Sequence, residues 1–347
     1  MVRYLQSLYS RRKARVRMRV GAISALIIVA VFVAFRYGHR LFGRSEDRAA
    51  AALVDDNAGD RMRPSVPVSP QPVRNPQPVT RSLQIKPGFT SEANPRVAKF
   101  IEEAMVLVNG KPSRLIEARD RLNEALSLPM NNAQRSVIKT KLSEFSNEWL
   151  FSRSVFEQDR FCSRYKVEPG NLISSIAREN KVPWEILLDI NKISRPELLK
   201  AGEMIKVIHG PFHVRVQLST FTMDLYLQDT YVCSYRVGIG RPGRETPTGM
   251  WRVKPGGKLI SPNWTDPDTY KTYRSGDPDY PLGSRWIALE GVSGEAEGRR
   301  GFAIHGTKKP EEIGTAGSRG CIRLYNGDVI RVYNMLTPGL SKVEVVE

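Results

Sequence analysis

Hydrophobic residues recur at helical spacing between residues 96 and 160. In RLIEARDRLNEALS, one helical face carries Leu115, Ala118, Leu122, Ala125 and Leu126. VIKTKLSEFSNEWL repeats the pattern with Val137, Ile138, Leu142, Phe145 and Trp149, and VAKFIEEAMVLV precedes both as a third amphipathic helix. Such stripes usually form a helix-on-helix core, although a docking face has the same pattern. We therefore expect a small helical segment, a spacer, over residues 96–160.

Residues 163–208 show a different alternation, with two short strands around two helices. Tyr165 to Val167 has the pattern of a strand, and a turn at Pro169-Gly170 leads to Asn171, which we expect to cap a helix. Pro183 opens a second helix, and KAGEMIKVI supplies a glycine turn and a returning strand. The pattern predicts a compact βααβ unit.

From residue 211 to residue 347 the apolar positions alternate with a period of two. The segments are FHVRVQLS, DLYLQDTYVCSYRVGI, MWRVK, RWIALEG, GFAIHG and KVEVV. One short helix near 326–336, with Asn326 as its expected cap, interrupts them. We expect a mainly β, β-sandwich-like domain. The long irregular stretch 256–283, rich in Trp and Tyr, is expected to form a lid.

The N-terminal part carries one apolar run. Val20 to Phe35 contains no charged residue and is flanked by Arg19 and Arg36. As a helix it would span about 24 Å, against roughly 30 Å for the hydrocarbon core, and flanking side chains can make up the difference. We expect a basic cytoplasmic tail at 1–19, a transmembrane signal anchor at 20–37 and a Pro-rich linker at 38–95. A cleaved signal peptide is the alternative.

The charge distribution supports this membrane interpretation. The formal net charge is +17, and the first 44 residues contribute ten Lys or Arg and no acidic residue. Because seven basic residues precede the apolar run and four follow it within twenty residues, the N-terminus is expected in the cytoplasm and the rest in the cell envelope. The remaining chain has only a small excess of basic residues and no recognised nucleic-acid motif, so we expect no nucleic-acid binding.

Three cysteines and four histidines do not form a disulfide scaffold or a group with metal-ligand spacing. We expect no metal and no cofactor. A disulfide between Cys162 and Cys233 is a minor alternative to two free thiols.

Two of these rare residues have a setting suited to catalysis. His305 ends the apolar strand of GFAIHG, and Cys321 follows Gly320 in a tight turn. A neighbouring His converts a thiol to a nucleophilic thiolate, and a glycine turn leaves N–H groups free to stabilise an oxyanion. Arg323 projects to the same side as Cys321 and can hold a carboxylate. A buried structural Cys and a core His are the alternatives.

The βααβ unit resembles the lysin motif (LysM). The resemblance rests on YKVEPGN, IAREN, Val182-Pro183, Asn191 and LKAGEMIKV. Asn171 stands where the family usually has Asp. The resemblance implies binding to the glycan of peptidoglycan through N-acetylglucosamine, although such a unit can also be retained as a spacer.

The C-terminal domain resembles the L,D-transpeptidase catalytic domain. The resemblance rests on IHGT, Ile313-Gly314, SRGCIRL and the upstream segment VGIGRPGRETPTGMWRV. It implies that Cys321 is the nucleophile, that His305 is the general base and acid, and that Gly306 orients the imidazole. Ser318, Gly320 and Cys321 are expected to shape the oxyanion hole. Thr307, Arg319 and Arg323 are expected to bind substrate, Arg319 standing where some members have His.

The two resemblances together imply an envelope enzyme that cross-links peptidoglycan stem peptides through a cysteine thioester. The expected partners are the glycan, through the LysM unit, and the stem peptides, through the catalytic cleft. Water, a D-amino acid or a protein lysine as acceptor would instead make it an L,D-carboxypeptidase, an exchange enzyme or a wall-protein ligase. A wall-binding protein without turnover and a generic cysteine peptidase are the remaining alternatives.

Overall fold

The computed structural model describes residue 90 and residues 92–347. The expected cytoplasmic tail, the transmembrane anchor and nearly all of the Pro-rich linker lie outside this range. Within the described residues, no helix combines the length and the apolar composition needed to span a bilayer.

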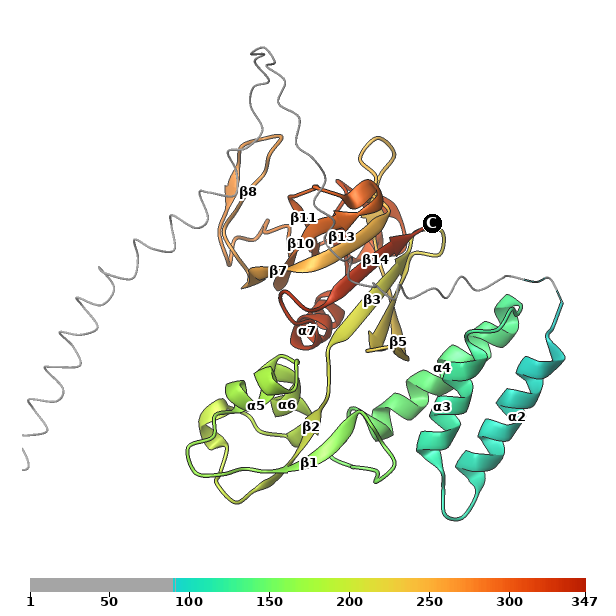
Figure 1. The fold of residues 1–347 in the computed structure, drawn as a ribbon. Helices are drawn as coiled ribbons and strands as arrows, with labels where there is room; N and C mark the ends of the chain where they lie inside the picture. The colour runs from blue at the N-terminus through green and yellow to red at the C-terminus, as the bar shows by residue number, and fades with distance from the viewer. Residues whose placement is uncertain (1–89, 91) are drawn as a thin grey trace, which may run out of the picture. The chain divides into compact units, whose positions relative to one another are not determined.

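Three helices form the first part of the described chain. They are α2 Pro95–Asn109, α3 Leu115–Ala125 and α4 Asn132–Trp149 (Figure 1). The side chains of Asn94 and Asn131 accept bonds from backbone N–H groups in the first turns of α2 and α4. The expected stripe on α3 is buried throughout. On α4 the prediction fails at Val137, which is 46% exposed, because Ile138 takes the inward position beside it.

A buried ion pair lies near the end of the helical segment, just before the βααβ unit. Arg119 of α3 and Asp159 are both fully buried, with Nη1 and Oδ1 2.8 Å apart. The Arg119 guanidinium also lies 4.4 Å from the ring centroid of Trp149. An ion pair buried this deeply tolerates loss of neither partner.

The βααβ unit has the expected order of elements. Its elements are β1 Cys162–Lys166, α5 Ile173–Glu179, α6 Trp184–Asn191, the 3-10 turn η1 Pro196–Leu198 and β2 Met204–Ile208. Strands β1 and β2 pair antiparallel. The prediction that Asn171 caps the first helix is wrong. Its Oδ1 instead accepts bonds from the Glu168 N–H and the Tyr165 hydroxyl, so it closes the preceding turn and α5 begins at Ile173 without a side-chain cap.

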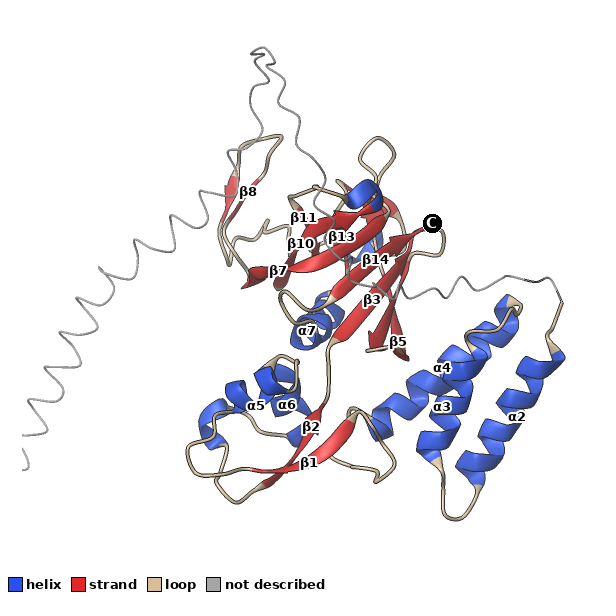
Figure 2. Ribbon diagram, in the orientation of Figure 1, coloured by secondary structure: helices blue, strands red, loops and turns tan. Residues whose placement is uncertain are grey.

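The C-terminal domain is built on one eight-stranded sheet (Figure 2). The strands in sheet order are β13 Ile322–Arg323, β11 Phe302–His305, β10 Arg285–Ser293, β7 Gly249–Ile260, β14 Lys342–Val346, β3 Phe212–Gln217, β4 Thr222–Leu227 and β5 Thr230–Arg236. The outer pair β11–β13 and the central pair β3–β14 are parallel, and the other pairs are antiparallel. A mainly β domain is confirmed, with eight of its strands joined in one sheet.

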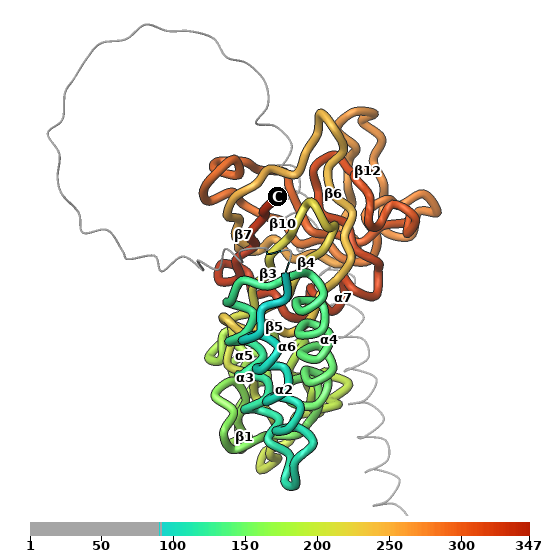
Figure 3. The backbone as a smooth tube through the Cα atoms, turned by 90° about the vertical axis from the view of Figure 1, so that its right-hand side faces the viewer, coloured from blue at the N-terminus to red at the C-terminus, as the bar shows by residue number. Residues whose placement is uncertain are grey.

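Shorter elements surround this sheet. They are β6 Ile239–Gly240, β8 Trp264–Thr265, β9 Thr272–Tyr273, η2 Gly294–Ala296, η3 Pro310–Glu312, β12 Ala316–Ser318 and α7 Asn326–Met335. Strands β6 and β12 pair in parallel and lie side by side (Figure 3). The stretch expected as a lid is only partly irregular, because residues 256–260 extend β7 and the rest contains the two-stranded ribbon β8–β9.

The helix α7 begins as expected, but Asn326 does not cap it. Tyr325 occupies the cap position without a side-chain bond. The Asn326 Oδ1 accepts a bond from the Ser284 N–H at 3.2 Å, and its Nδ2 donates to the Thr307 carbonyl at 2.9 Å. Asn326 therefore holds together two loops that are distant in sequence and that flank His305.

Candidate active site

The sheet brings His305 and Cys321 to neighbouring strands. Ile304 pairs with Ile322 and His305 with Arg323 across the parallel strands β11 and β13, and the Leu324 N–H donates to the His305 carbonyl at 2.9 Å. Cys321 immediately precedes β13. Because side chains on a strand alternate between its faces, the side chains of Cys321, Arg323 and His305 belong to the same face.

The turn that carries Cys321 is closed by buried hydroxyl groups. The Ser318 hydroxyl donates to the Cys321 carbonyl at 2.6 Å and accepts from the Gly320 N–H at 3.1 Å. The Thr246 hydroxyl donates to the Gly320 carbonyl at 2.8 Å and accepts from the Gly240 N–H at 3.0 Å. The turn is thus anchored both within itself and to β6.

Glycine is required at position 320 for two reasons. Its φ of +108° lies in the left-handed region. A Cβ added there would lie 2.7 Å from the Phe302 ring. The N–H of Gly320 is occupied by Ser318, so Ser318 and Gly320 support the turn but direct neither of these groups toward a substrate.

His305 is buried in a setting that keeps it neutral. Its Nδ1 lies 2.6 Å from the Gly306 carbonyl. Because a carbonyl oxygen only accepts, Nδ1 carries the proton and Nε2 is the basic nitrogen. Burial and the positive charge of Arg323 lower the pKa of His305 to about 4, although bonds to the carbonyls of Gly306 and Leu282 oppose the shift. The imidazole also stacks on Trp286, with ring centroids 5.5 Å apart.

The thiol of Cys321 is held in its neutral form as well. Burial raises its pKa, and the Ala303 N–H together with the Arg323 charge oppose this shift. This balance favours the neutral thiol over a preformed thiolate. The pair instead suits proton transfer from thiol to imidazole as the sulfur attacks.

Arg323 is engaged within the protein. Its guanidinium pairs with Glu312, which also accepts a bond from the Lys309 ammonium at 3.0 Å. Its backbone N–H and carbonyl both bond to Gly238, which connects β13 to the segment before β6. A substrate carboxylate at Arg323 would have to compete with Glu312.

Two other residues expected to bind substrate have different surroundings. Thr307 is buried, and its hydroxyl accepts a bond from the Lys309 N–H at 3.0 Å, as in a short turn. Arg319 belongs to the turn that carries Cys321, which we call the catalytic turn. Its side chain pairs with Asp266 and Asp268 of the β8–β9 ribbon.

Sequence reasoning missed four residues that shape the site: Trp286, Glu312, Asn326 as a tether, and Asp266. Nothing in their local sequence marks them, since each acts through a partner far along the chain. Thr246 was noticed only as part of the motif-like segment TPTG.

The other two cysteines, Cys162 and Cys233, are free thiols outside the candidate site. Cys162 is buried, and burial raises its pKa to about 12; burial likewise raises the pKa of Cys233 to about 11. The minor alternative of a disulfide between them is not formed in the structure. Among the described residues, no group of three or more His, Cys, Asp or Glu is arranged to hold a metal ion.

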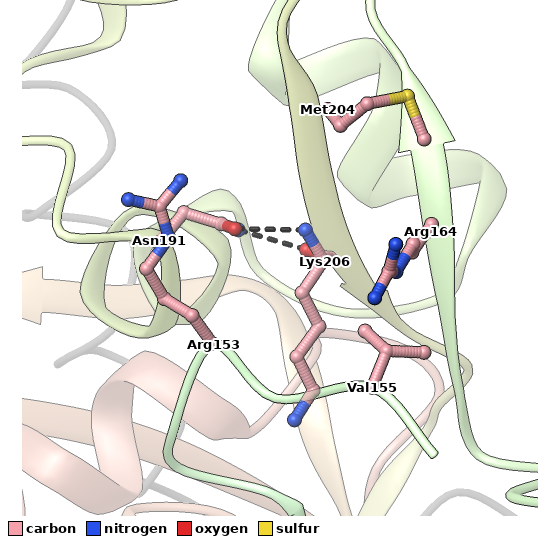
Figure 4. A pocket seen from close by; sticks show the side chains of 6 residues that line it. All are labelled: Arg153, Val155, Arg164, Asn191, Met204 and Lys206. Carbon is pink, nitrogen blue, oxygen red and sulfur yellow. Dashed lines mark hydrogen bonds between the residues drawn. The ribbon is translucent and has the colours of Figure 1, made fainter. Parts of the chain in front are cut away.

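A separate pocket of about 170 Å³ lies against the β1–β2 sheet (Figure 4). It is lined by Arg153, Val155, Arg164, Asn191, Met204 and Lys206, none of which belongs to the C-terminal domain. Lys206 is buried, and its ammonium donates to the carbonyls of Trp149 and Ser152 at 2.5 and 3.0 Å. This pocket therefore belongs to the joint between the helical segment and the βααβ unit.

Comparison with known proteins agrees with this arrangement. Residues 211–345 match the family model of the L,D-transpeptidase catalytic domain (YkuD), and residues 165–207 match that of the LysM domain. The putative L,D-transpeptidase YkuD of Bacillus subtilis is 30% identical over 182 residues, which cover 50% of this chain and 94% of that protein. This chain belongs to the YkuD family of L,D-transpeptidases.

Two further proteins illustrate the range of similarity. The putative L,D-transpeptidase YkuD of Bacillus licheniformis is 29% identical, over 50% of this chain and 94% of that protein. A crystal structure of L,D-transpeptidase 3 from Mycobacterium tuberculosis, in complex with a faropenem-derived adduct, is 20% identical with a TM-score of 0.32. The similarity covers 42% of this chain and 65% of that one.

Family membership gives the C-terminal domain its class. It is a mainly β YkuD domain of a transpeptidase family, preceded by a LysM domain and by helices.

Proposed function

We propose that this YkuD-family member is a peptidoglycan L,D-transpeptidase that acts through a thioester on Cys321. The observation that supports the proposal is the parallel pairing of β11, which ends at His305, with β13, which directly follows Cys321, together with the turn before β13 that Ser318 and Thr246 close.

The first half-reaction forms the thioester. The Sγ of Cys321 attacks the carbonyl carbon of the third residue in a donor tetrapeptide, while Nε2 of His305 takes the thiol proton. The Cys321 backbone N–H is the donor we assign to the resulting oxyanion, since the Gly320 N–H is already bonded to Ser318. Collapse breaks the peptide bond, and terminal D-alanine leaves with the proton returned from His305.

The second half-reaction transfers the acyl group. An acceptor amine attacks the thioester carbonyl and gives a proton to Nε2, and the thiol is released when that proton returns to sulfur. The product is an amide cross-link and the enzyme is unchanged. Because both groups are neutral at rest, the enzyme begins each half-reaction without separated charges.

The LysM domain and the location are part of the same proposal. LysM domains imply binding to peptidoglycan glycan strands, which would hold the catalytic domain near its stem peptides. Such a substrate places the enzyme in the cell envelope. The membrane anchor predicted at 20–37 would keep it there.

The test is product analysis with a disaccharide-tetrapeptide. We expect the purified full chain to form a cross-linked dimer that has lost one D-alanine, detected by mass spectrometry. Cys321→Ala should lower turnover at least about 1,000-fold, with an unchanged melting temperature. Cys233→Ala is the matched thiol control and should retain turnover.

Each alternative acceptor has its own product in this assay. Tripeptide alone would indicate water, and exchange of the terminal residue would indicate a D-amino acid. If a folded protein gives no product and the Cys321 thiol is unreactive toward alkylating reagents, the enzyme proposal is contradicted. That result would favour a wall-binding protein.

A further inference from the structure

The ribbon β8–β9 has little internal support. It pairs through only two residues on each strand and forms its own two-stranded sheet, separate from the main one. Its cross-strand contacts are a bond between the hydroxyls of Thr265 and Thr272 at 2.9 Å and the stacking of Trp264 on Tyr273. A two-stranded ribbon of this size is marginal by itself, so its position depends on outside contacts.

Four charged side chains supply such contacts. Asp266 Oδ1 lies 2.8 Å from Nη1 of Arg319, and Asp268 Oδ2 lies 3.2 Å from Nε of the same arginine. Arg244 pairs with Asp268 at 3.1 Å. We call Arg244, Asp266, Asp268 and Arg319 the ribbon network. Its two acidic and two basic groups balance one another.

Asp266 is the organising residue of this network. It is 8% exposed, and its Oδ1 also accepts bonds from the N–H groups of Asp268 and Thr269 at 2.9 and 3.2 Å. These bonds and that of Arg319 lower the pKa of Asp266 against the opposing effect of burial, so the carboxylate is ionised at neutral pH. One carboxylate thus shapes the ribbon turn and binds the catalytic turn.

Both arginines emerge from segments that hold Cys321. Arg319 lies between Ser318 and Gly320, whose polar groups close the catalytic turn. Arg244 precedes Thr246, whose hydroxyl bonds to the Gly320 carbonyl. The network therefore attaches the ribbon to the catalytic turn, whose backbone is held by the bonds of Ser318 and Thr246.

We propose that Arg319 is a positioning residue, which acts with Asp266 and Asp268 to hold the aromatic ribbon beside Cys321 and so to shape the substrate channel. This assignment replaces the direct substrate binding that the resemblance led us to expect of Arg319. It deepens the proposed function and rests on it for its kinetic consequences. Because the pairs are partly exposed, each contributes modestly and the ribbon can open to admit substrate.

The kinetic test compares variants that each remove one charge. Asp266→Asn keeps the Oδ1 acceptor for the ribbon turn and removes the charge that binds Arg319. We expect KM for the tetrapeptide to rise about 5- to 10-fold in Asp266→Asn and in Arg319→Gln, with kcat within about twofold. The double variant should be no worse than the more affected single variant, since both break the same contact. Glu290→Gln, which breaks the exposed Arg252 pair, should leave both constants unchanged.

A second measurement does not require turnover. Hydrogen exchange in 261–283 and alkylation of Cys321 by iodoacetamide should both accelerate about threefold or more in Asp266→Asn, and not in Glu290→Gln. If the wild-type protein shows no transpeptidation but hydrogen exchange and alkylation still accelerate in Asp266→Asn, the proposed function is wrong and the positioning role of the ribbon network is supported. Unchanged exchange and alkylation would overturn the network, as would a fall in kcat with constant KM.

Discussion

At the scale of single residues, burial and the nearby cation of Arg323 together set the charge of two titratable groups, His305 and Cys321. Arg323 pairs with His305 across the strands, and its charge lowers the pKa of both His305 and Cys321. Burial has the larger effect on both groups: it lowers the pKa of His305 further, and at Cys321 it outweighs Arg323 and raises the pKa. The result is a neutral imidazole and a neutral thiol at physiological pH.

The pH dependence of the reaction follows from this balance. The proposed mechanism needs neutral His305, so the acid limb of kcat/KM should fall near pH 4 rather than near 6.5. Arg323→Gln removes a positive charge that helps to lower the pKa of His305, so the acid limb should move toward higher pH. Rate profiles from pH 4 to 8 would measure this, with Arg252→Gln as the control. A limb that does not move would contradict the assigned role of Arg323.

The same shift has a consequence for stability. The pKa of His305 is depressed in the folded state, to about 4, from an ordinary 6.5. The unfolded chain then binds more protons between these values. Stability from this group is complete above about pH 6.5 and is lost as the pH falls toward 4.

At the scale of elements, short strands owe their positions to side-chain bonds. Strands β6 and β12 are two and three residues long and form a small sheet of their own. Thr246 connects β6 to the catalytic turn and is 4% exposed. Its hydroxyl satisfies one donor and one acceptor that have little access to water.

Removing that hydroxyl should affect both stability and rate. We expect Thr246→Val to lower the free energy of unfolding by about 2–3 kcal/mol, because the Gly240 N–H and the Gly320 carbonyl lose their partner. The turn that carries Cys321 should loosen and kcat should fall about tenfold or more. Urea unfolding and steady-state rates would measure this. Thr246→Ser should recover most of the loss, and Thr222→Val, at an exposed hydroxyl pair, should change stability by less than about 0.5 kcal/mol.

At the scale of the whole described chain, the helical segment is more than a spacer. The ammonium of Lys139 on α4 lies 2.5 Å from a carboxylate oxygen of Asp224, which is 4% exposed on β4. The Tyr231 N–H of β5 donates to the Asn123 side chain at 2.8 Å. Because β5 ends the main sheet, the helices cover an edge that would otherwise be open to pairing with another chain.

This contact should stabilise the catalytic domain. Lys139→Met leaves the Asp224 carboxylate short of its cation, and we expect a loss of about 1–3 kcal/mol, less than for a fully buried pair since Lys139 keeps some exposure. Denaturation of the full chain would measure the loss. Lys141→Met, at the exposed Lys141–Glu144 pair, is the control and should stay within about 0.5 kcal/mol. Equal effects of the two variants would show that the Lys139–Asp224 contact does not contribute to the free energy of unfolding.

The sequence by itself determined the order of the elements and indicated Cys321 and His305 as the candidate reactive pair. The period of hydrophobic positions is a local property, so the three helices, the βααβ unit and the alternating strands could be read from it. Cys321 and His305 could be found because their motifs are short and contiguous. The local signals failed at Asn171 and Asn326, whose side chains bond to partners outside their own helices.

Only the tertiary structure decided how the pair is held. The pairing of Arg323 with Glu312, of Arg319 with Asp266 and of Asn326 with Thr307 joins segments through folding, and no periodicity encodes such contacts. The protonation states follow from burial and from the placement of Arg323, which exist only in the folded chain. Sequence therefore identified the chemistry, and the packing of distant segments set its geometry and charge.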